Sequence, residues 1–182
     1  METVREGLLR RHMNLELHRP VVCEQERTAT FYLWNLSGQM VGYQLHRPDA
    51  PKTSACNNPR DGRYYTYRKQ PTHGVWGVES LCLSDGPVFV TEGVFDAARM
   101  TAVGQSALAM CANNPQRDMR DWLYSLARPV VVVCDNDKNR AGNKLAKFGH
   151  YVEYCPKLGM DLGDAPQDFV NYLVNKYNPN NK

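Results

Sequence analysis

The strongest constraint on the fold is a regular alternation of strand-like and helix-like segments that begins at residue 86. The apolar, strand-like runs lie at residues 87–91, 105–112, 128–134 and 150–155. The segments of helical pattern lie at 94–104, 115–127, 140–149 and 165–176. This alternation predicts βαβ units and a parallel sheet that is covered on both faces. Right-handed crossovers place the carboxyl ends of its strands at one edge, where such sheets bind ligands.

The first half of the chain has a different pattern, in which strands follow one another. The expected elements are a helix at 3–13, strands at 28–35, 40–46 and 63–68, a turn at 36–39 and a loop at 48–62. The first two strands and their turn predict a β-hairpin. We therefore expect an α/β chain with a small basic α+β subdomain at 1–85, a parallel-sheet domain at 86–177 and a tail at 178–182.

Composition restricts the class of protein. Of the 182 residues, 42% are hydrophobic and 23% are charged, which is ordinary for a globular protein. The longest apolar run, Val130–Cys134, is far shorter than the roughly 20 residues of a membrane span. The N-terminus lacks the pattern of a signal peptide. We therefore expect a soluble, cytoplasmic protein without a membrane partner.

The six cysteines are typical of free thiols. At least twenty residues separate each cysteine from the next, and no CxxC pair occurs, so a zinc site is not expected. Cys82, Cys134 and Cys155 lie in or beside apolar segments, where a free thiol packs as a small hydrophobe. Three disulfides are the alternative for an even count, but nothing else in the sequence looks secreted.

Positive charge is concentrated in the N-terminal part. Residues 1–70 contain eleven Lys and Arg against seven Asp and Glu, whereas residues 71–182 contain eleven against twelve. Between residues 41 and 69, six bases are interleaved with four tyrosines, at positions 43, 64, 65 and 67. Bases with interleaved aromatics suit a polyanion with stackable faces, such as single-stranded nucleic acid. The alternative is a solvated sheet face with tyrosines packed beneath it.

Acidic residues follow the expected strands of the second half. The carboxylates that should meet at one sheet edge are Glu92, Asp135, Asp137, Asp161 and Asp164. Like charges this close repel one another unless a cation neutralises them, and oxygen ligands suit Mg²⁺ or Mn²⁺. Gly93 and Gly142 would let the backbone approach a phosphate closely.

Two of these acids, and Asp96 near them in the sequence, also have a purely structural interpretation. Asp135 or Asp137 could cap a helix, and Asp96 could be a surface acid that complements the helix dipole. The arrival of Glu92, Asp135 and Asp137 at equivalent strand ends favours the metal site instead.

Two of these segments resemble the motifs of Toprim domains. VFVTEGVFDAARM resembles the first, E-G-x-x-D-A after a buried strand, and VVVVCDNDKNRAGNKLA resembles the second, D-x-D-x-x-x-x-G before a helix. One strand and one helix separate them, as in that family, and the resemblance covers residues 86–175. Toprim domains occur in primases, topoisomerases, recombination proteins and nucleases.

The segments that precede the Toprim motifs indicate which group of Toprim proteins the chain resembles. GYQLHRP, RYYTYR and HGVWGVES are similar to segments of primases of bacteriophages and their bacterial relatives, in which a basic subdomain precedes the Toprim fold. MDLGDAPQDF resembles the third acidic motif of primases, with Met160 and Gly163 where the family usually has Lys and Asn.

The resemblance implies a DNA primase, a nucleotidyltransferase that makes short RNA primers from ribonucleoside triphosphates on single-stranded DNA. The implied catalytic residues are Glu92, Asp135 and Asp137. The implied ligands of Mg²⁺ or Mn²⁺ are the same three residues with Asp161 and Asp164. The implied supporting residues are Asp96, Gly93 and Gly142. The bases expected to grip template or triphosphate are Lys52, Arg60, Arg63, Arg68 and Lys69.

Two features depart from the primase pattern. Family members usually carry a zinc ribbon, which the cysteines exclude here, and many phage members continue into a helicase, for which no residues remain after Lys182. We therefore expect a catalytic core that works with a separate helicase or replication protein, in the host cytoplasm if a phage encodes it. A Toprim nuclease and a non-catalytic nucleic-acid-binding module are the alternative hypotheses.

Overall fold

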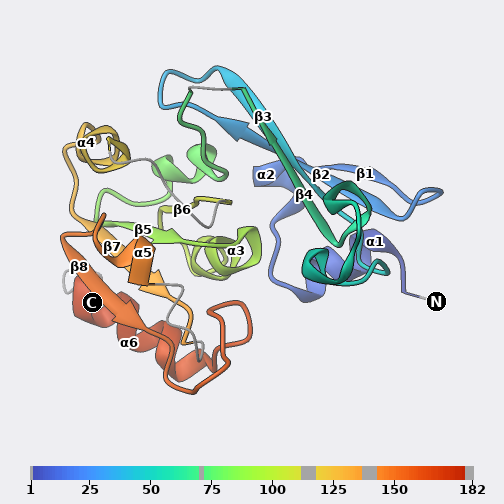
Figure 1. Cartoon of the computed structure of the whole chain (residues 1–182). Helices are drawn as coiled ribbons and strands as arrows, with labels where there is room; N and C mark the ends of the chain where they lie inside the picture. The colour runs from blue at the N-terminus through green and yellow to red at the C-terminus, as the bar shows by residue number, and fades with distance from the viewer. Residues whose placement is uncertain (1, 70–71, 112–117, 137–142, 179–182) are drawn as a thin grey trace.

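The computed structural model describes residues 2–69, 72–111, 118–136 and 143–178. It contains two four-stranded sheets, one antiparallel and formed by the first part of the chain, the other parallel and formed by the second part. Figure 1 shows the antiparallel sheet in blue to green and the parallel sheet in green to orange. The α/β class and the parallel sheet flanked by helices are confirmed.

The parallel sheet has the strand order β6-β5-β7-β8. Its strands are β5 (Val88–Thr91), β6 (Ala107–Ala109), β7 (Val130–Cys134) and β8 (Tyr151–Tyr154). Its helices are α3 (Val94–Thr101), α4 (Met119–Tyr124), α5 (Asn143–Ala146) and α6 (Gln167–Tyr177). All residues of β5, β6 and β7 are buried, because α3 and α6 cover one face of the sheet and α4 and α5 cover the other.

The antiparallel sheet has the strand order β1-β2-β3-β4. Its strands are β1 (Val21–Cys23), β2 (Thr28–Trp34), β3 (Met40–His46) and β4 (Tyr64–Arg68). The accompanying helices are α1 (Val4–Arg10), α2 (Leu15–His18) and the short 3₁₀ helices η1 (Thr53–Ala55), η2 (Pro59–Asp61) and η3 (Val78–Cys82). The hairpin of β2 and β3 confirms the prediction, whereas β1 and α2 were not predicted, because three and four residues are too short to show a period.

The two sheets are joined by a pair of consecutive residues. Val75 exchanges two backbone hydrogen bonds with Trp34 of β2, and Trp76 exchanges two with Ala109 of β6. The Trp76 side chain is 2% exposed and packs against Phe31 and His18. One hydrophobic core therefore continues from the antiparallel sheet into the parallel one. The predicted domain boundary at residues 85 and 86 stays a prediction.

The cysteines correct one expectation. All six are free; Cys134 and Cys155 are buried as predicted, but Cys82 is exposed. Cys82 ends η3, a one-turn helix on the surface, and its thiol contacts the carbonyl of Glu79. Among the described residues, the structure has no helix of the length and apolar character that a membrane crossing needs.

Candidate functional site

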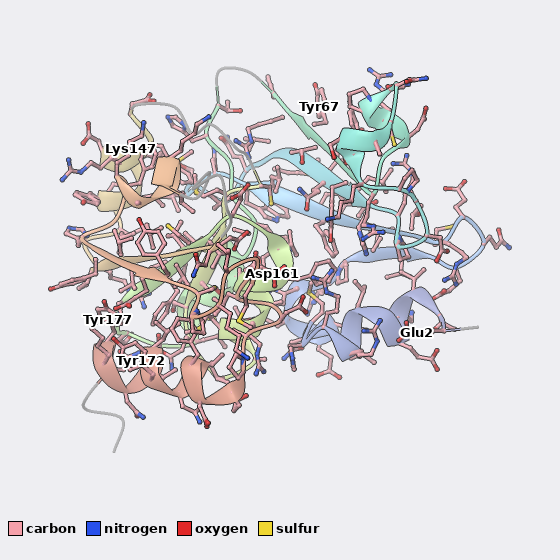
Figure 2. The ribbon with its side chains drawn as sticks, turned by 60° about the horizontal axis from the view of Figure 1, so that its bottom comes forward. Glu2, Tyr67, Lys147, Asp161, Tyr172 and Tyr177 are labelled. Atoms are coloured by element: carbon pink, nitrogen blue, oxygen red, sulfur yellow. The ribbon has the colours of Figure 1, made fainter. Side chains whose placement is uncertain are left out.

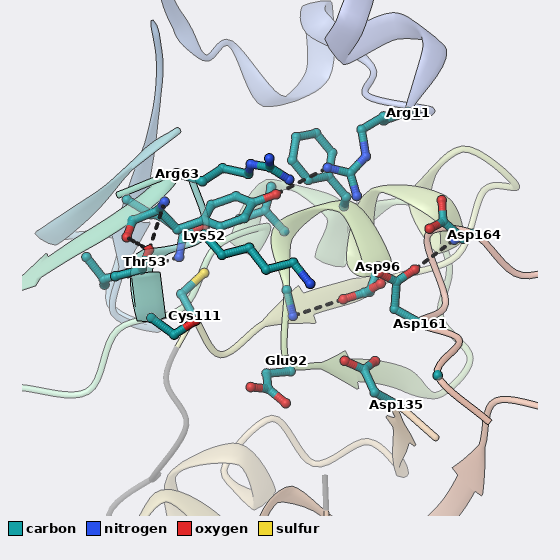
Figure 3. Close-up of a pocket in the computed structure, with 18 residues that line it drawn as sticks. Arg11, Lys52, Thr53, Arg63, Glu92, Asp96, Cys111, Asp135, Asp161 and Asp164 are labelled. Carbon is teal, nitrogen blue, oxygen red and sulfur yellow. Dashed lines mark hydrogen bonds between the residues drawn. The ribbon is translucent and has the colours of Figure 1, made fainter. Parts of the chain in front are cut away.

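A pocket of about 840 Å³ lies between the two sheets (Figure 3). One wall is the carboxyl edge of the parallel sheet, and it presents Glu92, Asp96, Asp135, Asp161 and Asp164. The opposite wall comes from the first part of the chain, and it presents Arg11, Lys52 and Arg63 with the polar side chains of β3 and β4. The pocket thus has an acidic wall and a basic wall that face each other.

Glu92 and Asp135 come to one place because β5 and β7 are parallel neighbours. Val88–Val90 pairs with Val130–Val132, so the two strands end at the same edge. A hydrogen bond from the Cys111 amide to the Glu92 carbonyl (2.9 Å) extends the pairing with β6 past the end of β5. The backbone next to Glu92 is therefore held by regular sheet geometry. α5 is described only from Asn143, and residues 137–142 lie outside the described part of the chain, so the helix-cap interpretation of Asp135 stays a prediction.

Asn136 holds the loop that carries Asp161 and Asp164 at the carboxyl edge of the parallel sheet. The sequence did not predict this role. Its amide donates to the Met160 carbonyl (3.1 Å), and its side-chain Nδ2 donates to the Cys155 carbonyl (2.9 Å). These bonds hold the loop that carries Asp161 against the end of β7. The only sequence signal for this contact is the amide between the two acids of the D-N-D run.

Asp96 is buried beneath the acidic wall. One carboxylate oxygen accepts the Gly93 amide (3.1 Å) and the other accepts the Gly163 amide (2.8 Å). The carboxylate thereby links the turn after β5 to the loop of Asp161 and Asp164. The surface interpretation of Asp96 is wrong, because its side chain lies in the core at 6% exposure. A Cβ at Gly93 would stand 2.6 Å from Asp96 Oδ2, so the glycine leaves room for this carboxylate.

Burial, together with the charge of Asp161, raises the pKa of Asp96 to about 7, against the opposing effect of the two backbone hydrogen bonds. The folded chain then holds a proton that the unfolded chain releases near the ordinary aspartate pKa of 3.8. Asp96 therefore contributes stability that is complete at low pH and is lost as pH rises through about 7. His46 has the opposite effect on how stability depends on pH. Burial lowers its pKa to about 4, so its contribution to the free energy of unfolding is lost as pH falls.

The difference in unfolding free energy between wild type and Asp96→Asn isolates the contribution of Asp96. Without divalent metal, the wild-type advantage in unfolding free energy should shrink by roughly 3–4 kcal/mol between pH 4 and pH 7, at about 1.4 kcal/mol per pKa unit. Urea unfolding in a chelator across this range measures it. A constant difference would show that Asp96 is ionised in the folded chain.

The basic wall includes a residue that sequence reasoning missed. Arg11 ends α1, and its guanidinium lies 3.6 Å from the centre of the Phe95 ring and donates to the Tyr64 hydroxyl (3.2 Å). Arg63 donates from Nε to the Ala50 carbonyl (3.2 Å). Both side chains are thus oriented before any ligand arrives. Arg11 lies outside every motif, and only the fold brings it to the pocket.

The five predicted bases are divided among three environments. Lys52 and Arg63 line the pocket. Arg60 and Lys69 are exposed and do not line it. Arg68 is half-buried, donates to the Met110 carbonyl (2.7 Å) and has a pKa lowered by burial. Its burial and this hydrogen bond indicate that Arg68 has a structural role, unlike the other four bases.

Three buried thiols lie near the acidic wall, and one of them, Cys111, lines the pocket. Burial raises the pKa of Cys111, Cys134 and Cys155 to about 12. The charges of Asp135 and Glu92 add to this effect at Cys134, and those of Asp135, Asp96 and Asp161 add to it at Cys155. These thiols stay protonated and unreactive at neutral pH.

The side chains of the acidic wall are of the chemical type that binds a hard divalent cation. Carboxylate oxygens are the ligands that Mg²⁺ and Mn²⁺ prefer. Burial is the main cause of the raised pKa of Asp96, and the negative charge of Asp161 adds to it. Within the described part of the chain, no group of three or more His, Cys, Asp or Glu side chains is close enough to hold a metal. Asp137 and Gly142, both predicted at this site, lie outside the described residues.

Comparison with known proteins gives matches at the level of structure. No model of a known protein family matches the sequence, and no curated protein matches it either. The RNA polymerase domain of Mycobacterium tuberculosis primase DnaG aligns with a TM-score of 0.60 at 17% identity, over 97% of this chain and 62% of that one. The zinc-binding and RNA polymerase domains of Aquifex aeolicus primase align with a TM-score of 0.61 at 15% identity, over 89% and 44%.

A third neighbour is the catalytic core of Escherichia coli primase, with a TM-score of 0.56 at 16% identity, over 97% of this chain and 64% of that one. The chain therefore spans less than two thirds of the primase structures that it matches. The shared region includes both sheets, because nearly the whole chain is aligned. The protein has the fold of the catalytic domain of DnaG primases.

Proposed function

We propose that this chain is a primase-like catalytic core that joins ribonucleotides on single-stranded DNA with the aid of Mg²⁺ or Mn²⁺. The observation that carries the proposal is the pocket with opposed acidic and basic walls, in a fold shared with primase catalytic domains. A nucleoside triphosphate bound with a divalent cation carries both negative and positive charge. The basic wall suits its phosphates, and the acidic wall suits the cation.

Each wall has a separate task in this proposal. Glu92 and Asp135, with Asp137, would hold the metal ions, which would supply the positive charge that neutralises the phosphates. Lys52, Arg63 and Arg11 hold the triphosphate from the other side. Glu92 would also accept the proton of a primer 3′-hydroxyl. Attack of this hydroxyl oxygen on the α-phosphorus forms the new bond, and pyrophosphate leaves.

The buried Asp96 has a positioning role. Its carboxylate lies at the base of the acidic wall and accepts the amides of Gly93 and Gly163, which adjoin Glu92 and Asp164. The acidic segments are thereby held together against their mutual repulsion. The remaining neighbours support a nucleic-acid partner, because one is described as a DnaG catalytic domain bound to single-stranded DNA.

The test is primer synthesis on a denaturing gel. Purified protein is mixed with labelled ribonucleotides, Mg²⁺ or Mn²⁺ and a set of single-stranded DNAs, with and without a replicative helicase. Short labelled RNA that requires both template and metal is the expected product. Shortened template strands would identify a nuclease instead. Salt-dependent DNA binding with no product under any metal would identify a binding module and contradict the proposal.

A further inference from the structure

The outer face of the antiparallel sheet carries a group of aromatic side chains. Successive residues of a strand point to opposite faces, and on β2 the buried Phe31 and Leu33 alternate with the partly exposed Tyr32 and Trp34. The residues that point outward on β2, β3 and β4 include Tyr32, Trp34, Tyr43, Tyr65 and Tyr67. We call these five side chains the aromatic platform.

The register of the strands makes the platform continuous. Tyr32 pairs with Tyr43, and Tyr43 pairs with Tyr67, so three tyrosines form a row across three strands. The rings of Tyr43 and Tyr67 have centroids 5.6 Å apart, and those of Tyr43 and Tyr65 are 6.4 Å apart. Tyr32 and Trp34 are also 6.4 Å apart. The face thus presents several π-surfaces at neighbouring positions.

The platform is accessible. Tyr67 is 49% exposed, and Figure 2 shows it projecting outward, away from the centre of the molecule where Asp161 lies. The other four side chains are partly exposed. An antiparallel sheet with one solvated face ordinarily places polar residues there. An exposed aromatic face therefore marks an interaction site.

The charge around the platform identifies the class of partner. None of the four strands contains Asp or Glu. The guanidinium of Arg60 lies 5.7 Å from the centre of the Tyr65 ring, so this base stands on the outer side of the sheet. Lys69, which follows β4, is exposed. Stackable rings with cations at their border suit single-stranded nucleic acid, whose bases stack on aromatic sheets.

We propose that the aromatic platform binds single-stranded DNA by stacking its bases, as the surface that supplies template to the pocket. This inference rests on the proposed function and assigns a separate surface to its template. The two faces of one sheet then have two tasks, since Gln44, Tyr64 and Thr66 on the inner face line the pocket. β4 is the edge strand, and Lys52 lies at the pocket wall, so a strand that passes over this edge reaches the site.

The test is fluorescence anisotropy with a labelled oligothymidylate, in the absence of nucleotides. Tyr67→Ala should weaken binding about tenfold, because one stacked base loses its partner. Tyr67→Phe keeps a ring and should bind like wild type. Tyr151→Ala is the matched control, since Tyr151 is 51% exposed but lies on β8 of the other sheet. Binding by Tyr67→Ala at the wild-type level would overturn the proposal and assign the platform to a protein partner.

A second measurement needs no variant. Photocrosslinking of wild type to iodouracil-substituted DNA should give adducts on Tyr43 or Tyr67, and adducts confined to other segments would overturn the proposal. The results of these DNA-binding tests can be distinguished from the result of the primer-synthesis test. Primer synthesis that accompanies unchanged binding by Tyr67→Ala contradicts only the platform. Ring-dependent binding without any primer product contradicts only the catalytic proposal.

Discussion

Replacement of Glu92 by glutamine is expected to reduce primer synthesis by about 10²–10³-fold, the usual loss when one charge-stabilising group is removed from an active site. Glutamine keeps the shape of the side chain but removes the negative charge that the proposed metal requires. Glu92 lies at the end of β5 in the acidic wall, so the change should act on catalysis. The measurement is the initial rate of labelled ribonucleotide incorporation at saturating template.

The matched control is Glu16→Gln. Glu16 is an exposed residue of α2 that does not line the pocket, and its replacement should leave the rate unchanged. Thermal unfolding of both variants should resemble that of wild type. A Glu92→Gln protein that synthesises primers at the wild-type rate would remove Glu92 from the catalytic site.

Replacement of Trp76 by alanine should lower the free energy of unfolding by about 3–5 kcal/mol. Trp76 is 2% exposed and packs between His18 and Phe31 where the two sheets meet. Its removal leaves a cavity in the core that both parts of the chain share. Equilibrium urea unfolding measures the loss, and a change in the urea dependence would show that the two parts no longer unfold together.

Trp122→Ala is the comparison for this prediction. Trp122 is partly buried and packs against the cluster on the α4 and α5 face of the parallel sheet. Its replacement should cost less, about 1–2 kcal/mol, and should leave the two parts unfolding together. Equal losses for the two variants would contradict the role of Trp76 as the link between the sheets.

The elements that the sequence predicted are those with strong local patterns. The run of Val130–Cys134 specifies a buried strand by itself, and Gly104 stops α3 with a φ of 77°. The acids after β5 and β7 could be placed because parallel strands end at one edge. This rule needs only the order of the elements, which the alternation of patterns supplies.

The contacts that escaped prediction are non-local. Arg11 reaches the pocket only because α1 packs near Phe95, which is far from it in sequence. Asn136 binds a loop that could adopt many paths. Arg68 has the same composition signal as Arg63, yet its strand position turns it toward Met110. Arg63 precedes β4 and Arg68 is its last residue, and the sequence alone does not say which of the two bases lines the pocket.

The opposed walls of the pocket make a thermodynamic prediction, because metal and triphosphate should strengthen each other's binding. The most direct test is calorimetric titration of a ribonucleoside triphosphate into wild type, Glu92→Gln and Lys52→Ala, each with and without Mn²⁺. Wild type should bind the nucleotide markedly tighter with the metal. Glu92→Gln should lose this enhancement, and Lys52→Ala should bind more weakly throughout. Nucleotide binding that is indifferent to the metal and to both substitutions would contradict a metal–triphosphate site in this pocket.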